Sequence, residues 1–258
     1  MGDTAGMTSL DPWRVVAAIA VLLVILVVVL TVAGVRIRRD ALVATARAGA
    51  QLAVVALVIA WVFRHPEGIV VYVVVMLVAA TATATRRVAC GRATVPVIGT
   101  AIAAGAVVTV VPVWLSGALE TTPEALVPFA AQIVGGAMIG SSLTGARLRD
   151  DVRSGWDQVE AWLSLGATPA QAVAPYGRTA IGAALAPPVD QTRSAGLVTL
   201  PGAFVGLLLG GATPAEAAFV QVLVLVGLLV AECVAGVVTA RGLGPVLGAH
   251  RPEDAATG

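Results

Sequence analysis

Glu232 is the first residue whose chemistry demands an explanation, because it lies inside a long apolar stretch, residues 215–238. A charged side chain in the middle of a bilayer costs about 2.5–3.5 kcal/mol on insertion scales. Such a carboxyl group lines a cavity, binds a proton or a cation, or pairs with an arginine of a neighbouring helix. The structural alternative is snorkelling towards the nearby interface. Glu232 is therefore a candidate residue of a substrate path.

Three glutamines also fall inside apolar stretches: Gln51, Gln132 and Gln221. Each can form a hydrogen bond across helices or help to line the same path. These two roles predict different neighbours, so both are kept as alternatives.

No group of side chains in the sequence supports catalysis. All sixteen basic residues are Arg, and the absence of Lys excludes a Schiff base, a Ser-Lys dyad and a phosphate-loop lysine. Cys90 and Cys233 are too few and too far apart for a disulfide framework or a metal cage. His65 and His250 are predicted on opposite sides of the membrane, and no metal ligands are identified. We expect a chain that is not an enzyme, binds no cofactor itself and has no nucleic-acid partner.

The elements that position these residues are predicted to be membrane-spanning helices. The chain is 58% apolar and 12% charged, and its apolar residues form several uninterrupted blocks. This composition predicts an all-α, polytopic bundle. A secretory signal peptide is the alternative for the first block, but no cationic segment or A-x-A-like site precedes it. The blocks and their breakers give about seven spans: 14–34, 44–63, 68–84, 95–115, 125–143, 195–210 and 215–238.

The arginines predict the topology of these spans. Only Arg14 and Arg64 fall on one side of the membrane. By the positive-inside rule, the N-terminus is outside and the C-terminus is cytoplasmic, which requires an odd number of spans. The fourteen arginines on the other side are Arg36, Arg38, Arg39, Arg47, Arg86, Arg87, Arg92, Arg147, Arg149, Arg153, Arg178, Arg193, Arg241 and Arg251.

Residues 1–240 are predicted to form a single transmembrane domain. Within it, residues 144–194 are the only sizeable segment predicted outside the bilayer, although entry of 173–186 into the membrane stays open. This segment is too short for a catalytic domain with its own core. Residues 241–258 are predicted to be a disordered cytoplasmic tail.

The stretch EAWLSLGATPAQA, residues 160–172, predicts a short helix followed by a corner. One or two turns of helix are not stable alone and must dock against something. The sequence GATPAQA recurs as GATPAEA at 211–217, and each copy predicts a helix end at Gly, a Thr cap and a capping box. The candidate docking residues are Glu160, Ala161, Trp162, Leu165 and Gly166.

Glycines repeat at intervals of four residues in two predicted spans. Such spacing places them on one helix face, where another helix can approach closely. Packing is the structural interpretation, and sliding between inward and outward states is the functional one. The residues are Gly136 and Gly140 in one span, and Gly202, Gly206 and Gly210 in another.

These motifs together resemble the FetB-like family, whose members are iron-export ABC-transporter permeases of bacteria and plant membrane subunits tied to aluminium tolerance. The resemblance covers roughly residues 40–240. It rests on the Glu160–Gly166 spacing, which is similar to the EAA loop of ABC permeases, and on these stretches: Arg47-x-x-x-Gln51-Leu52, Gly140-Ser-Ser-Leu143, Arg178-Thr-Ala-Ile181, Pro188-Val-Asp190 and Gly196-Leu-Val-Thr-Leu-Pro-Gly202.

The resemblance implies a homodimeric permease in the bacterial cell (inner) membrane that exports a metal ion such as iron. A separate cytoplasmic ATPase subunit would bind ATP and Mg²⁺, and Ser141 and Ser142 join the path candidates. The chain departs from the family at Ala203 to Val205, which replace two methionines and a threonine, and at Ser141 and Asp190, which replace asparagines. A stand-alone secondary transporter or channel for a small solute is the alternative function.

Overall fold

The computed structural model describes residues 11–35, 37–120 and 122–249. These residues form helices and connecting turns, and no β-strand occurs among them. The predicted all-α class is confirmed. The helices are α1 (Pro12–Val32), α2 (Arg38–Arg64), η1 (Pro66–Gly68), α3 (Ile69–Val88), η2 (Arg92–Thr94), α4 (Val95–Leu115), α5 (Pro123–Ser154), α6 (Trp156–Ser164), α7 (Pro169–Ser194), α8 (Gly202–Leu209) and α9 (Pro214–Ala249).

Contacts within the chain divide it into two compact units, Met1–Arg64 and His65–Gly258. The first unit contains α1 and α2, whose large apolar side chains, such as Leu22 and Leu57, are mostly exposed. Helices of this kind are stable where lipid replaces water around them. A single domain over residues 1–240 stays a prediction.

Within the described ranges, six helices are long and apolar enough to cross a membrane: α1, α2, α3, α4, α5 and α9. They cover six of the seven predicted spans. The remaining span, 195–210, is not one helix. Residues 195–201 form a turn closed by the Gly196 N–H, which donates to the Thr199 carbonyl oxygen at 2.9 Å. The following α8 has eight residues and is about 12 Å long, too short to cross. The high average hydropathy of this stretch predicted a span, although the stretch contains residues that interrupt a helix.

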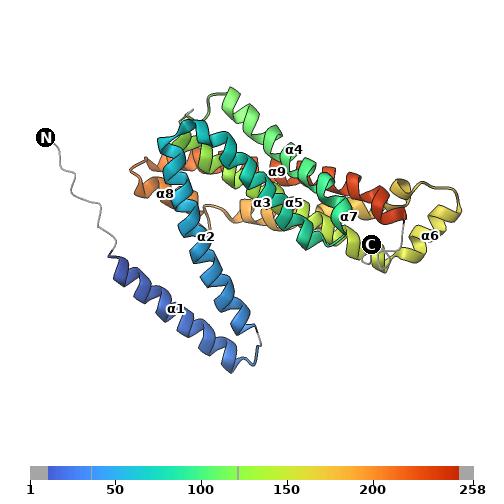
Figure 1. The fold of residues 1–258 in the computed structure, drawn as a ribbon, viewed down its shortest axis with the longest axis horizontal. Helices are drawn as coiled ribbons and strands as arrows, with labels where there is room; N and C mark the ends of the chain where they lie inside the picture. Colours follow the sequence, from blue (N-terminus) through green and yellow to red (C-terminus); the bar gives the residue numbers. More distant parts are fainter. Residues whose placement is uncertain (1–10, 36, 121, 250–258) are drawn as a thin grey trace. The chain divides into compact units, whose positions relative to one another are not determined.

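The second unit is built around the pair α5 and α9 (Figure 1). Gly136 of α5 lies against Leu228 of α9, and Gly145, further along α5, lies against Leu243. The two helices therefore run in the same direction. Side chains of α3, α4, α5 and α9 complete a core whose largest fully buried members include Ile98, Ile102, Ile133, Leu148 and Leu243.

Helix α4 packs on α9 in the opposite direction. Thr109 of α4 lies against Gly227, and Val97, near the start of α4, lies against Gly242. The close approach at Gly105, where an added methyl group would lie 2.6 Å from the Ala231 carbonyl oxygen, brings the two backbones together.

The predicted extramembrane segment 144–194 is mostly helical. Helix α5 continues to Ser154, α6 follows it, and α7 runs for 26 residues. Small side chains of α7, including Ala180 and Ala184, are buried against its neighbours. Within the second unit, α6 and α8 lie at opposite ends of the bundle, and α7 extends between them (Figure 1).

Helix α9 extends beyond the predicted end of the membrane domain. It continues to Ala249, and Leu243 and Leu247 are buried in the core. Residues 241–249 are therefore helical and packed, which corrects the boundary predicted for the disordered tail. The rest of that tail, with His250, lies outside the described residues.

Candidate functional site

A seam of buried polar side chains lies between α5 and α9. Its members are Ser141 and Thr144 on α5 and Glu232 and Thr239 on α9, all of them buried. The hydroxyl groups of Ser141 and Thr239 share a hydrogen bond of 2.7 Å. We call this set the α5–α9 polar seam. It joins two predicted path residues, Ser141 and Glu232, to two that the sequence did not single out.

Glycines allow the backbones to meet along this seam. A methyl group on Gly140 would lie 2.6 Å from the Glu232 carbonyl oxygen, and one on Gly136 would lie 2.6 Å from Cδ2 of Leu228. On the opposing helix, a methyl group on Gly236 would lie 2.9 Å from Oγ1 of Thr144. None of these glycines has room for a larger side chain, because the two helices lie so close together. Glu232 is therefore held against α5.

Two polar atoms of the seam lack a hydrogen-bond partner among the residues described: Oε2 of Glu232 and Oγ1 of Thr144. Glu232 is only 6% exposed. An unpaired carboxylate in such surroundings is costly, so the site favours a bound proton or a cation over a bare charge. No group of three His, Cys, Asp or Glu residues gathers in the described ranges.

The other predicted path residues lie elsewhere. Gln221 is buried, and its Oε1 accepts the backbone N–H of Phe204 at 3.1 Å, which ties α8 to α9. Ser142 donates to the Met138 carbonyl oxygen of its own helix at 2.7 Å. Gln132 is exposed on α5, and Gln51 is exposed on α2 in the first unit. For Gln221 the structure therefore supports the hydrogen-bonding role.

The three glycines of the predicted sixth span are also not brought against another helix. Gly202 and Gly206 lie on α8 with open space where a methyl group would be added. Gly210 follows the end of α8, and an added methyl group would meet only backbone atoms of that same helix. Their predicted role in packing between helices is not realised within the residues described.

At the end of the bundle that carries α6, this nine-residue helix is fixed to α7. The Tyr176 hydroxyl on α7 lies 3.1 Å from the Gly155 carbonyl oxygen and 3.0 Å from Oε1 of Gln158. The side chain of Val159 is fully buried beneath α6. These contacts satisfy the requirement that so short a helix have a tertiary support.

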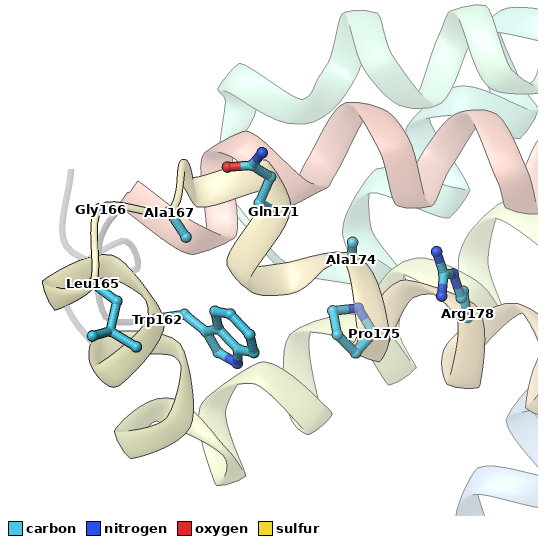
Figure 2. Close-up of a pocket in the computed structure, with 8 residues that line it drawn as sticks. All are labelled: Trp162, Leu165, Gly166, Ala167, Gln171, Ala174, Pro175 and Arg178. Carbon is cyan, nitrogen blue, oxygen red and sulfur yellow. The ribbon is translucent and has the colours of Figure 1, made fainter.

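A cleft of about 490 Å³ opens between α6 and α7. Figure 2 shows Trp162 and Leu165 on one wall and Pro175 and Arg178 on the other. Trp162 is 55% exposed and Leu165 is 82% exposed. The full lining is Trp162, Leu165, Gly166, Ala167, Gln171, Ala174, Pro175 and Arg178. Two other candidate docking residues, Glu160 and Ala161, are exposed on α6 but do not line the cleft.

The corner beside this cleft has the predicted geometry. Gly166 adopts a left-handed φ of +90°, and Thr168 and Gln171 form the capping box of α7. The second copy behaves alike: Gly211 has φ of +94°, and the Thr213 N–H donates to Oε2 of Glu216 at 2.9 Å. Sequence reasoning missed the α7 wall. The i, i+4 and i, i+7 spacing of Gln171, Pro175 and Arg178 indicates one helix face once this segment is taken as a helix.

Comparison with known proteins identifies the family. The family model described as "Uncharacterised protein family (UPF0014)" matches residues 13–244. The chain belongs to this family. The UPF0014 chain is 34% identical over 202 residues to "UPF0014 membrane protein STAR2" of Oryza sativa, covering 78% of this chain and 71% of the relative. It is 31% identical over 211 residues to "Protein ALUMINUM SENSITIVE 3" of Arabidopsis thaliana, covering 81% and 77%.

A bacterial relative supports the motif-based resemblance. The UPF0014 chain is 42% identical over 124 residues to the "Probable iron export permease protein FetB" of Escherichia coli, covering 48% of each chain. No solved structure matches the chain. The predicted resemblance is confirmed, and with its six helices of spanning length this UPF0014 chain is a multi-pass membrane protein.

Proposed function

We propose that this UPF0014 chain is the membrane-embedded permease subunit of an ABC transporter, acting as a homodimer with separate ATPase subunits. The name of the E. coli relative, an iron export permease, supports export of a metal ion with iron as the leading candidate. Because the chain has no lysine, a phosphate loop must belong to another chain. ATP and Mg²⁺ would then be bound by that partner.

The observation that carries this proposal is the α6 corner. Trp162 and Leu165 present apolar surface beside a cleft, and within the described part of the chain both side chains are exposed. An exposed aromatic anchor on a rigid short helix is typical of a docking site for another protein. The hydrogen bonds of Tyr176 would transmit movement of the docked α6 to α7.

Transport would follow alternating access, in which ATPase closure biases two packings of the bundle. The arginine distribution supports a topology with the α6 end in the cytoplasm and the N-terminus outside. The bacterial relative supports a location in the bacterial cell membrane. The Glu232 carboxyl group, buried and unpaired among the residues described, is the path residue best placed to bind a cation or a proton in transit.

The test is Trp162→Asp, with Ser164→Asp as its matched control on the same helix. Asp at 162 places a charge in the apolar docking contact, so we expect the amount of co-purified ATPase and ATP-dependent Fe²⁺ transport in proteoliposomes to fall tenfold or more, an effect of roughly 1.4 kcal/mol or more. Ser164 is exposed and does not line the cleft, so its variant should behave like the wild type. Unchanged co-purification and transport in Trp162→Asp would remove the coupling assignment.

A second variant probes the corner itself. Gly166→Pro replaces a residue with φ of +90° by one restricted to about −65°, and it removes the N–H that donates to the Leu163 carbonyl oxygen. Membrane insertion should persist, while ATP hydrolysis should no longer drive transport.

A stand-alone secondary transporter or channel is the second candidate, and the unpaired Glu232 favours it, because intramembrane carboxyl groups recur in ion-coupled carriers. The same proteoliposomes without the ATPase decide between the two. Full-rate Fe²⁺ flux in the absence of any nucleotide hydrolase would replace the ABC assignment with this one.

A further inference from the structure

Helix α7 must cross the membrane, although its composition does not predict it. Helices α5 and α9 both have spanning length and run in the same direction. The chain therefore has to return across the bilayer between the end of α5 at Ser154 and the start of α9 at Pro214. Every residue of that interval is described, and α7 is the one helix there longer than nine residues.

The packing of α7 agrees with this crossing. Pro169, at the start of α7, lies against Gly248 near the end of α9, and Gly177 lies against Ala240. At its other end, α7 shares a cleft with Gln221 near the start of α9. The two helices are therefore antiparallel along the length of α7, which is about 39 Å for 26 residues and exceeds a hydrocarbon core of about 30 Å.

One face of α7 is buried and the opposite face is not. Ala180 and Ala184 are buried against the bundle. The exposed side chains on the other side, which we call the outer face of α7, are Arg178, Thr179, Gly182, Ala183, Ala186 and Asp190. Their spacing of three, four and seven residues places them on one broad stripe of the helix.

The outer face is unsuited to contact with lipid. It carries the guanidinium of Arg178, for which the described residues show no ion pair, and the Asp190 carboxylate, which pairs with Arg193 at 3.2 Å. Between them the exposed side chains are mostly small or hydroxyl-bearing, and Val189, 40% exposed, is the large apolar exception, so α7 is not among the six helices apolar enough to span. Charged side chains in membrane-crossing helices face a partner or a water-filled cavity.

Open space accompanies α7 at both ends. A cleft of about 480 Å³ between α7 and α9 has Arg178 and Arg241 in its lining, and another of about 370 Å³ lies near Thr192 and Gln221. Both are lined by side chains of these two helices, together with α8 and its preceding turn at the second. These clefts leave open space beside α7 near both ends of the helix.

We propose that the outer face of α7 lines a water-filled pathway through the membrane, by which a hydrophilic ion passes the bundle. This inference rests on the proposed transport function for its biological role, but its geometry requires only that α5, α7 and α9 all cross. It adds a path-lining surface that is separate from the α5–α9 polar seam.

The experiment measures the reaction of single cysteines with a membrane-impermeant, positively charged methanethiosulfonate reagent in native membranes. Cys90 and Cys233 are first replaced by Ala. Ala183→Cys and Ala186→Cys report the outer face, Ala184→Cys reports the buried face, and Val107→Cys reports an exposed apolar position on α4. Each signal is normalised to labelling of the same chain after denaturation, so poor expression of one variant does not imitate protection.

We expect the outer-face cysteines to react at least tenfold faster than Ala184→Cys and Val107→Cys. Slow reaction at all four positions would overturn the proposal, because the outer face would then be sealed by lipid or protein. Fast reaction at Ala184→Cys as well would also overturn it, because α7 would then lie outside the membrane. The labelling needs neither ATPase nor substrate, so failure of the proposed function would leave this result intact. Slow labelling of the outer face would likewise leave the proposed docking of an ATPase on α6 untouched.

Discussion

Two regions of this molecule carry glycines at four-residue spacing, and they use them differently. Along the α5–α9 polar seam, Gly140 lies against the backbone of Glu232 and Gly136 lies against the Leu228 side chain. In α8, Gly202 and Gly206 have open space around them. The same spacing therefore marks a possible close approach without specifying one, and the partner helix decides whether it forms.

The difference follows from the elements that carry the glycines. Helix α5 has 32 residues and packs along α9, so its glycine face has a partner over several turns. Helix α8 has eight residues, buries none of them, and is tied to α9 by the bond between Phe204 N–H and Gln221. The position of so short a helix is set by the segments that connect it to the rest of the chain, rather than by packing along its own length.

The largest effect is expected for Gly140→Ala in the seam. Its methyl group would lie 2.6 Å from the Glu232 carbonyl oxygen, and since that atom belongs to the backbone the two helices must separate. Overpacking of this kind costs about 1–3 kcal/mol of unfolding free energy, which denaturant titration in mixed micelles measures. Gly135→Ala is the control on the same helix, because an added methyl group there meets open space. Equal stability of the two variants would contradict the close contact.

Gly206→Ala in α8 should give a smaller change of opposite sign. With no neighbour within 4 Å, the methyl group meets nothing, and replacing Gly by Ala within a helix stabilises it by about 0.5–1 kcal/mol. The same titration measures this change. A loss of stability comparable to that of Gly140→Ala would contradict the open space at Gly206 and show that α8 packs closely against another surface.

The smallest effect concerns the hydrogen bond within the seam. A double-mutant cycle of Ser141→Ala and Thr239→Val removes the 2.7 Å contact between the two hydroxyl groups. Hydrogen bonds between membrane helices contribute about 0.6 kcal/mol on average, so a coupling energy of this size is expected from the four unfolding titrations. A coupling energy of zero would mean that each hydroxyl group finds an equally good hydrogen-bond partner when the other is removed.

The corners of the fold could be predicted because their causes are local. Gly166, Thr168 and Gln171 adopt the left-handed turn and capping box that their types and spacing indicate. The six apolar helices were likewise predictable, since length and hydropathy alone decide whether a helix can span. The turn at 195–201 was missed because its apolar residues outweighed its breakers in the average.

The candidate site was predictable only in part. Glu232 and Ser141 were identified as polar residues within apolar stretches, but Thr144 and Thr239 gave no separate signal, since hydroxyl side chains commonly bond to their own helix. The Arg178 wall of the cleft was missed because its segment was taken to lie outside the bundle. Arg178 lines the cleft because α7 packs beside α9. No local sequence pattern encodes that packing.

The sequence by itself determined the helical class, the six apolar helices and the two capped corners, because each depends on residue type and short-range spacing. Only the tertiary structure decided that α5 and α9 run in the same direction, that α7 returns between them, and which glycines meet a neighbour. The reason is physical: direction and contact are properties of pairs of helices, and the free energy that selects them comes from packing between residues far apart in the chain.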